Sequence, residues 1–434
     1  MWSKRSTIEW KLVKDSSIWE VEKIRILPVV LKLSYDNLLP HLKRCFAYCC
    51  MFPKGCNMEK DVVIQLWVSN GYIPPRGEIS LYVLGEEIFN CLVWRSFFHI
   101  VKDNKLWGDR YKMHDLIHDM AQHVMRHDFL VIEPACNEVK FPNEVLHLSS
   151  PCPEFFFSRQ NLKNLTSLRS ILMFGEINES CISQIFNHIY LRVLYLCGIG
   201  LRTLPKSICK LKHLRYLNLS ESSIEVLPES IIYLQNLQVL LLCYCHKLCK
   251  LPEGLKFMTN LQCLDVSFCT SLLSFPFGIN ELTSLRILPW FLVGKESGAK
   301  IGELGDLNLI EGELQISGLE NVGGLCEAKS AGFKCKRNLS VLKLSWSNFS
   351  MREGQGETFA NDEEVLEGLE PNPRLKGLEI YNYMGTVISP SWMVNLENLV
   401  EIRFFRCKKC EHIPPLGRLP NLRTPPICFF VYRN

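Results

Sequence analysis

The stretch LRVLYLCGIGLRTLPKSICKLKHLRYLNLS, which runs from Leu191 to Ser220, contains the pattern that decides the fold of this chain. Leucine fills the first, fourth and sixth positions of LRVLYL, and the same spacing returns in LRYLNL. Five in-register copies occur, and they start at Leu191, Leu214, Leu237, Leu261 and Leu285. Such regular recurrence predicts a repeat architecture.

The spacing L-x-x-L-x-L is that of a leucine-rich repeat, in which each copy forms one short strand with its leucines inside a coil. Cys245 and Cys269 occupy the later position at which this pattern carries Asn or Cys. No turn can bury its apolar face alone, so the turns must stack on one another. The sequence therefore predicts a solenoid with a curved sheet on its concave face.

The repeat pattern is weaker in three places. Between about Pro289 and Arg337 glycines cluster, and we expect irregular repeats or an insertion. The acidic stretch 352–370 is expected to be a longer convex loop, after which the pattern continues. Near the end, Thr424-Pro425-Pro426 stands where the next strand is due, and proline cannot donate to a strand ladder. We expect strand pairing to stop there, leaving the solenoid without a polar cap.

The strand positions between the leucines are predicted to face the concave side. Mixed aromatic and charged side chains on such a face suit protein recognition, whereas the alternative is a solvated face without a partner. The residues that we expect to bind a partner are Tyr195, Tyr216, Asn218, Asp265, Glu379, Tyr381, Arg403 and Phe405.

The first half of the chain has helical periodicity followed by a β-hairpin. Helices are expected over Ile26–Tyr35, Leu38–Met51, a run from the N-cap Asp61 to Gly71, and Val83–Val93. Phe97–Val101 and Arg110–Met113 are expected to form the hairpin, so that the whole resembles a winged helix. DNA binding is disfavoured, because the best candidate recognition helix, DVVIQLWVSN, has no Lys or Arg.

The segment RYKMHDLIHDMAQH differs by one methylene from the zinc-protease signature H-E-x-x-H. On a helix His114 and His118 would share a flank, beside an apolar stripe of Met113, Ile117, Met120, Ala121 and Val124. A catalytic zinc is disfavoured, since no third ligand is evident and Asp is shorter than the usual Glu base. The histidines are either structural, or His114 faces an anion at the start of the helix.

Composition excludes several classes of protein. The 434 residues carry a net charge of only +4, which does not indicate nucleic acid or an anionic membrane. There is no secretory signal and no apolar run long enough to span a membrane, so we expect a cytoplasmic, reduced protein. The group Cys45, Cys49, Cys50 and Cys56 lacks paired C-x-x-C spacing and is interpreted as structural, with no metal bound.

Several motifs occur together in a fixed order. They are LSYDNL from Leu33, CFAYCCMFPKG from Cys45, IQLWVSNGYI from Ile64 and KMHDLIHDMA from Lys112. With the repeats, they resemble the plant intracellular immune receptors of the coiled-coil NB-ARC leucine-rich-repeat class, over nearly the whole chain. The resemblance implies that Met113, His114 and Asp115 close the winged-helix part of a nucleotide-binding module, with the His facing the β-phosphate of ADP.

The phosphate-binding elements of that module are not recognisable in the sequence. No G-x-x-x-x-G-K-[ST] occurs, so we expect a truncated receptor that does not hold the ADP or ATP of the intact family by itself. The expected fold is α+β and multidomain, with a mainly α winged-helix domain before an α/β solenoid. Its predicted parts are 1–25, a helical remnant; 26–130, the winged helix; 131–165, a linker and cap; and 166–434, the repeats.

The resemblance implies a disease resistance protein without catalytic activity. The expected partners are a pathogen effector or a guarded host protein bound by the repeats, and a nucleotide-binding module supplied in trans. The alternatives are a leucine-rich-repeat interaction scaffold and a nonfunctional gene fragment.

Overall fold

A computed structural model describes residues 32–101, 109–125, 128–131, 145–151, 165–175, 179–346, 361–413, 416–423 and 427–429. The chain divides into two compact units. The first comprises Met1–Phe174 with Tyr190–Leu194, and the second comprises Gly175–Ile189 with Tyr195–Asn434. Each unit is described by itself.

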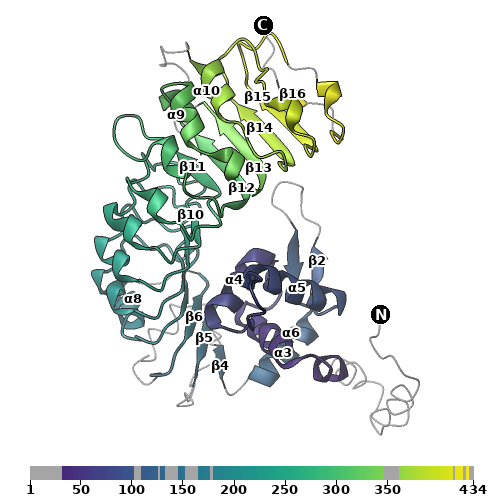
Figure 1. The fold of residues 1–434 in the computed structure, drawn as a ribbon. Coiled ribbons are helices and arrows are strands. Elements are labelled where there is room, and N and C mark those ends of the chain that lie inside the picture. The colour runs from purple at the N-terminus through teal and green to yellow at the C-terminus, as the bar shows by residue number, and fades with distance from the viewer. Residues whose placement is uncertain are drawn as a thin grey trace, which may run out of the picture. The chain divides into compact units, whose positions relative to one another are not determined.

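The first unit begins with a small helical domain that carries a hairpin (Figure 1). Its elements are α3 (Pro40–Tyr48), η3 (Cys49–Met51), β1 (Met58–Glu59), α4 (Lys60–Asn70), α5 (Leu81–Trp94), β2 (His99–Val101), β3 (Arg110–Lys112) and α6 (Asp115–Met125). The strands form an antiparallel sheet in the order β1-β3-β2. The hairpin and three of the predicted helices, which correspond to α3, α4 and α5, are therefore confirmed.

Local sequence signals explain most helix ends in this domain. Gly71 follows the last residue of α4 and has a left-handed backbone with φ of 76°, the conformation in which glycine commonly ends a helix. Ser80 caps α5, because its hydroxyl accepts the Tyr82 N–H at 3.3 Å. Asp61 is not an N-cap: α4 begins at Lys60, its N-cap is Glu59, and Asp61 lies in the first turn.

In place of one helix over Leu38–Met51, the structure has the α-helix α3 followed directly by the short 3-10 helix η3. Pro40 lies in the first turn of α3, where its missing N–H costs nothing, and the helix tightens into η3 after Tyr48. Most of the predicted helix Ile26–Tyr35 lies outside the described residues. The same holds for the predicted remnant at 1–25.

The first unit also contains the first parallel strands. These are β4 (Phe129–Val131), β5 (His147–Ser150) and β6 (Ser170–Met173), with β4 paired to β5 and β5 paired to β6. Leu148 and Ile171 are opposite one another and completely buried. Strand β7 (Val193–Tyr195) contains residues assigned to each unit.

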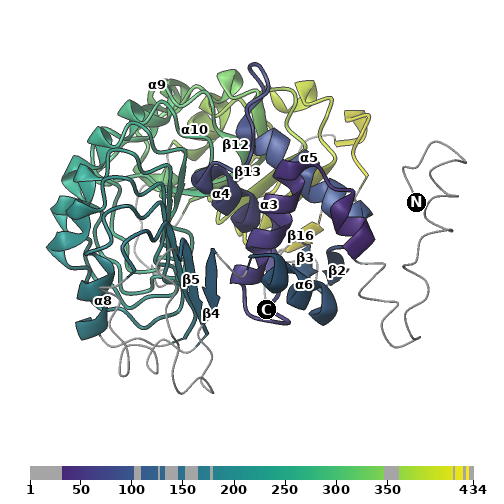
Figure 2. The same ribbon diagram turned by 90° about the horizontal axis from the view of Figure 1, so that it is seen from below.

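The second unit consists of stacked turns, each with one short strand and one convex segment (Figure 2). The first turns contain α8 (Glu179–Ile185), η5 (Lys206–Lys210), β8 (Tyr216–Asn218), η6 (Glu229–Tyr233), β9 (Val239–Leu241), η7 (Glu253–Phe257), β10 (Cys263–Asp265) and η8 (Ile279–Glu281). Leu217, Leu240 and Leu264 are opposite one another in register and completely buried. The leucine positions thus build the core that the repeat pattern predicts.

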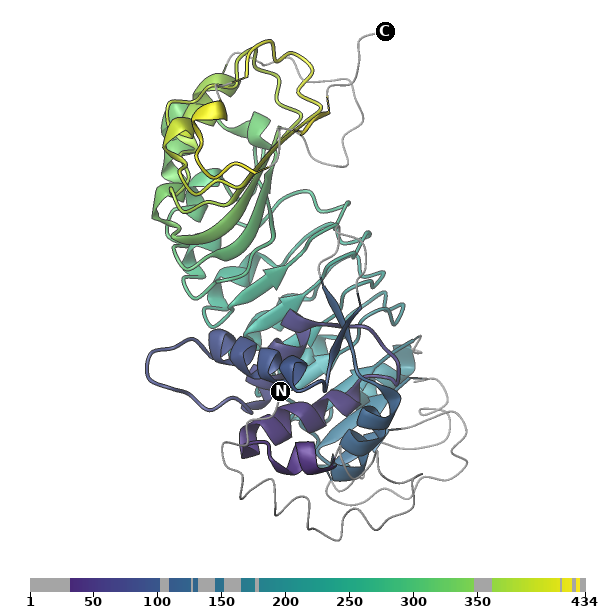
Figure 3. The same cartoon turned by 90° about the vertical axis from the view of Figure 1, so that its right-hand side faces the viewer.

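The later turns share one parallel sheet in the order β11 to β16 (Figure 3). Its elements are β11 (Trp290–Leu292), η9 (Ile301–Leu304), β12 (Glu311–Ser317), η10 (Leu319–Asn321), α9 (Leu325–Ser330), η11 (Phe333–Cys335), β13 (Asn338–Ser345), α10 (Asp362–Gly368), β14 (Gly377–Tyr381), η12 (Met393–Asn395), β15 (Glu401–Phe405), η13 (Leu416–Arg418) and β16 (Ile427–Phe429).

The structure decides between the two expectations for the region from Pro289 to Arg337. It contains irregular repeats and not an insertion, because β11 and β12 continue the stack while the register shifts between Gly312 and Glu313. Its glycines occupy tight turns, such as Gly318 with φ of 80°, rather than breaking the repeat. Strand pairing also does not stop at Thr424–Pro426, because β16 follows the prolines and pairs with β15.

Polar side chains join each turn to its neighbour. Asparagines just before the strands donate to a carbonyl of the preceding turn, as Asn236 does to Lys212 at 2.7 Å and Asn398 does to Pro373 at 3.0 Å. Glutamates accept backbone N–H groups at the start of a neighbouring 3-10 segment. These bonds satisfy backbone groups that would otherwise be left without partners.

Among the described residues, no helix combines the length and apolarity needed to cross a membrane.

Candidate functional site

The Met-His-Asp triplet lies at the junction between β3 and α6. Met113 is buried and anchors the junction, while His114 and Asp115 are exposed. The Leu116 N–H lies 3.3 Å from His114 Nδ1, so this ring nitrogen caps the helix as an acceptor. In a neutral ring with this tautomer Nε2 carries the proton, which leaves an outward hydrogen-bond donor at the start of α6.

His114 and His118 do not form a pair, contrary to the expectation that they share a flank. His118 is buried, and its Nε2 lies 2.8 Å from the Phe52 carbonyl oxygen. The predicted apolar stripe also ends early, because Val124 is 39% exposed. Among the described residues no group of three His, Cys, Asp or Glu side chains is placed to hold a metal ion.

The separate sequence motifs converge around α6. Phe52 and Lys54 belong to the CFAYCCMFPKG segment, and both contact α6, the former through His118 and the latter through a 2.6 Å ion pair with Asp119. Within the same segment Cys45, Cys49 and Cys50 are buried, and burial raises the pKa of each thiol. Buried, protonated thiols act as small apolar side chains.

The end of the IQLWVSNGYI segment packs against the first parallel strands. Ser170 donates to Asn70 Oδ1 at 3.0 Å, and Arg192 donates to the Asn70 carbonyl at 3.2 Å. Tyr72 Oη lies 2.7 Å from Nε2 of the buried His147. Burial, reinforced by Arg169 and Arg192, lowers the pKa of His147 to about 3. These contacts join the winged helix to β5 and β6 within the first unit, and nothing in the sequence periodicity indicates them.

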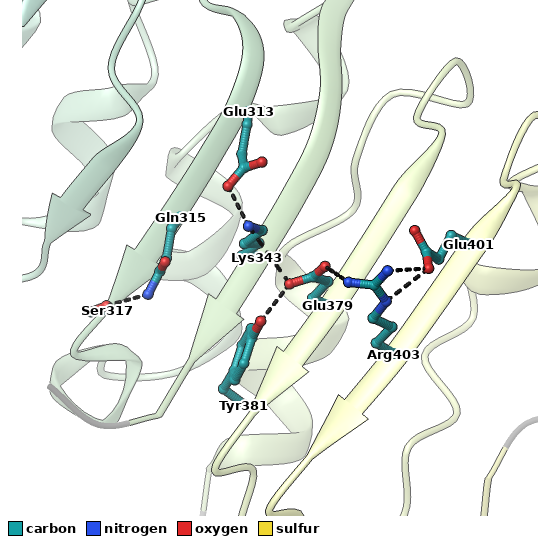
Figure 4. Close-up of polar contacts among 8 residues, drawn as sticks. All are labelled: Glu313, Gln315, Ser317, Lys343, Glu379, Tyr381, Glu401 and Arg403. Atoms are coloured by element: carbon teal, nitrogen blue, oxygen red, sulfur yellow. Dashed lines mark hydrogen bonds and ion pairs between the residues drawn. The ribbon is translucent and has the colours of Figure 1, made fainter. Parts of the chain in front are cut away.

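In the second unit, a row of charged side chains crosses the concave face of β12 to β15 (Figure 4). Strand register places Lys343 opposite Glu379 and Glu379 opposite Arg403. Glu379 lies 3.8 Å from Lys343 Nζ and 3.1 Å from Arg403, and its side chain is only 9% exposed. The outer carboxylates are Glu313, which pairs with Lys343, and Glu401, which lies 2.5 Å from Arg403. Charges therefore alternate across the strands.

An aromatic pair lies beside this charged row. The rings of Tyr381 and Phe405 stack with centroids 4.6 Å apart and planes inclined by 7°. The Tyr381 hydroxyl donates to Glu379, and burial together with this carboxylate raises the pKa of Tyr381 above its usual value. A guanidinium, carboxylates and flat rings in one place form a surface suited to recognising a protein.

The predicted concave residues of the earlier turns are less accessible. Tyr216 and Asn218 are buried, contrary to the expectation that they face a partner, and Asn218 Nδ2 lies 3.4 Å from Tyr216 Oη. Tyr195 and Asp265 are half-buried.

Sequence reasoning missed part of the charged row. The missed residues are Glu313, Gln315, Lys343 and Glu401. Glu313 and Gln315 lie in EGELQIS, whose alternation of polar and apolar residues is a strand signal that the surrounding glycines obscured. Lys343 and Glu401 each lie in a recognised repeat, at a non-leucine position.

Three family models match parts of this chain and agree with this architecture. Residues 51–121 match the family model described as "Disease resistance protein Winged helix domain". Residues 189–246 match a leucine-rich repeat model, and residues 301–427 match the model "R13L1/DRL21 LRRs". A solved leucine-rich-repeat protein of Leptospira interrogans is 20% identical over 64% of this chain and 72% of its own, with a TM-score of 0.44.

Curated relatives match almost the whole chain. "Disease resistance protein RGA2" of Solanum bulbocastanum is 42% identical over 97% of this chain and 41% of its own length. "Putative disease resistance protein RGA4" of the same species is 37% identical over 97% of this chain, and an RPP13-like protein of Arabidopsis thaliana is 35% identical over 96%. The chain spans about two fifths of the length of these relatives. It is therefore a homologue of plant disease resistance proteins, with their winged-helix domain and their leucine-rich repeats.

Proposed function

We propose that this chain acts in plant defence as a recognition component, which binds a pathogen effector or a guarded host protein through the concave face of its repeats. The observation that carries the proposal is the charged and aromatic row over β12 to β15 (Figure 4). Its outer carboxylates remain accessible, since Glu313 is 48% and Glu401 is 35% exposed. Binding needs no catalytic group, and we expect the protein to act in the cytoplasm.

The test of this role is a pathogen challenge of plants in which the gene for this chain is disrupted. The expected result is increased pathogen growth, which the intact gene reverses and a Glu401→Lys gene does not. The matched control is Lys206→Glu, which reverses an exposed charge on the convex side. Equal pathogen growth with and without the intact gene would contradict a defence role.

We also propose that His114 contacts the terminal phosphate of ADP. The exposed ring at the first turn of α6 fits this role, because Nδ1 is engaged by the Leu116 N–H and Nε2 is left as a donor. The neighbouring Met113 fixes the junction by its burial, and Asp115 opens the helix. No phosphate-binding loop is recognisable within these 434 residues, so a test with this chain needs an added module that carries one.

This second proposal is tested by mixing the chain with a separately expressed P-loop module of the same receptor class and measuring retained ADP. His114→Ala is expected to reduce retention about tenfold, the loss typical of one charge-assisted hydrogen bond. His123→Ala, which removes an exposed histidine of the same helix, serves as the control. If retention depends on neither histidine, the scaffold alternative gains, in which the concave face acts and the triplet does not.

A further inference from the structure

We propose that the edge formed by Glu221, Tyr244, Asp265 and Phe268 in the second unit binds an arginine side chain of a protein partner. This inference rests on the proposed recognition role and adds the chemistry of the partner. It concerns turns β8 to β10, which are separate from the charged row over β12 to β15.

The first observation is an unusual backbone at the same position of successive turns. Gly198, Glu221, Tyr244 and Phe268 all have positive φ, with values of 71°, 59°, 59° and 60°. Each of the first three donates its N–H to the next turn, as Tyr244 does to the Ser267 carbonyl at 2.9 Å. Glycine fits this left-handed conformation without strain, whereas Tyr and Phe do not. Bulky side chains kept at strained positions point to a functional use of those side chains.

The second observation is the platform that these side chains form. The rings of Tyr244 and Phe268 are parallel within 6°, with centroids 4.6 Å apart. Phe268 is 51% exposed, and His246 lies edge-on to Tyr244 at 6.1 Å. A large aromatic ring is exposed here although the solenoid core lies one residue away, at the buried Cys269.

The third observation is unbalanced negative charge beside the platform. Glu221 is exposed and Asp265 is half-buried, and neither forms an ion pair within the part of the chain that the structure describes. Within strands β8, β9 and β10 the residues between the core leucines include no Lys or Arg: they are Tyr216, Asn218, Val239, Leu241, Cys263 and Asp265, and Arg215 lies just before β8. Burial raises the pKa of Asp265 above its usual value, as expected for a carboxyl group with no nearby cation.

The charged row of Figure 4 shows what completes such a set within this same protein. There a stacked pair, Tyr381 and Phe405, also accompanies two carboxylates, and Arg403 lies between them, bonded to Glu379 and Glu401. In turns β8 to β10 stacked rings and carboxylates recur, and among the described residues no guanidinium pairs with Glu221 or Asp265. A partner arginine supplies it, because a planar guanidinium stacks on aromatic faces and pairs with carboxylates at once, which an ammonium does less well.

The experiment uses the full chain and a fluorescein-labelled, seven-residue glycine-serine peptide that carries two arginines. Matched peptides carry citrulline, the neutral isostere, or lysine in their place, and binding is followed by fluorescence anisotropy. The arginine peptide is expected to bind at least about tenfold more tightly than the citrulline peptide, and more weakly as salt rises. Equal binding of the arginine and citrulline peptides would overturn the proposal.

Variants separate binding from folding. Replacing both Tyr244 and Phe268 with glycine removes the rings and suits the left-handed backbone. We expect the thermal midpoint to be kept while arginine-peptide binding weakens about tenfold, and Glu221→Gln to weaken it less. Phe257→Ala, which removes an exposed ring from the convex side, is the control that should bind as the parent does. Parental binding by the double glycine variant would also refute the site.

The outcome is distinguishable from failure of the recognition role itself. If the peptides do not discriminate but Glu401→Lys still fails to restore resistance in the challenged plants, recognition stands and only the arginine edge is rejected. If the plants show no defence role, arginine-selective binding at this edge would remain a measured property of the chain.

Discussion

At the scale of single residues, Glu379 is the most constrained member of the charged row. Its carboxylate forms ion pairs with Lys343 and Arg403 and accepts a hydrogen bond from the Tyr381 hydroxyl, and its side chain is 9% exposed. Removing one partner of a buried ion pair costs about 3–5 kcal/mol, and the cost is lower here because Arg403 is 37% exposed. We expect Glu379→Ala to reduce the free energy of unfolding by about 1–2 kcal/mol in urea titrations.

Glu313→Ala is the matched control for this prediction. Glu313 also pairs with Lys343, but its side chain is 48% exposed, and exposed pairs contribute about 0–1 kcal/mol. Equal losses for the two variants would mean that burial does not decide the strength of this row. The alternating charges would then contribute no more to stability than exposed ion pairs do.

At the scale of elements, carboxylates hold the 3-10 segments of neighbouring turns together. Glu303 accepts the N–H groups of Gly278 and Ile279, both at 2.8 Å, at the start of η8. This is a capping bond supplied by the next turn, and caps contribute about 0.5–2 kcal/mol. Glu303→Ala is therefore expected to lower the unfolding free energy by about 1 kcal/mol, measured by chemical denaturation.

Glu281→Ala provides the comparison within the same turn. Glu281 lies in η8 itself and is exposed, and surface substitutions of this kind change stability by less than about 0.5 kcal/mol. If Glu281→Ala lowered the unfolding free energy as much as Glu303→Ala does, the loss would come from local helix propensity and not from the contact between turns.

The elements also show why sequence reasoning succeeded and where it failed. Leucine spacing predicts the strands because only those positions can fill the core, and Leu217, Leu240 and Leu264 are completely buried. The expectation that strand pairing stops at Pro425 and Pro426 is wrong, because β16 follows these prolines and pairs with β15. The prediction of Asp61 as the N-cap is wrong because the helix begins two residues earlier than expected, which places Asp61 in the first turn.

The candidate sites were predictable only in part. The triplet Met113-His114-Asp115 could be placed at a helix start, since apolar periodicity sets the helix. The separation of His118 from His114 depends on the Phe52 carbonyl, which is distant in sequence. Likewise the concave row needs strand register, and one sequence does not reveal that Lys343 lies opposite Glu379.

At the scale of the whole molecule, the two units differ in how acid should affect them. His147 in the first unit has a pKa of about 3, lowered from 6.5, so the unfolded state binds more protons between these values and stability rises with pH there. In the second unit burial raises the pKa of Asp265 and of Glu320. Their effect on stability has the opposite dependence on pH, because the folded state then binds protons more readily than the unfolded state. Burial also raises the pKa of Asp61 in the first unit, which acts in the same direction as Asp265, so the expected acid sensitivity of that unit comes from His147.

Lowering the pH from 7 to 5 should reduce the free energy of unfolding of the first unit by about 2 kcal/mol. For a buried histidine that stays neutral when folded, each step of one in pH below 6.5 costs about 1.4 kcal/mol. Native-state hydrogen exchange, corrected for intrinsic rates, should show α4 and β5 losing protection together, because Tyr72 and His147 join them. His147→Gln should abolish the pH dependence in both elements, and β12 to β14 should not share it. Loss of protection in β5 alone would show that the winged helix and the first strands open independently, and that the hydrogen bonds of Asn70 and Tyr72 do not couple them.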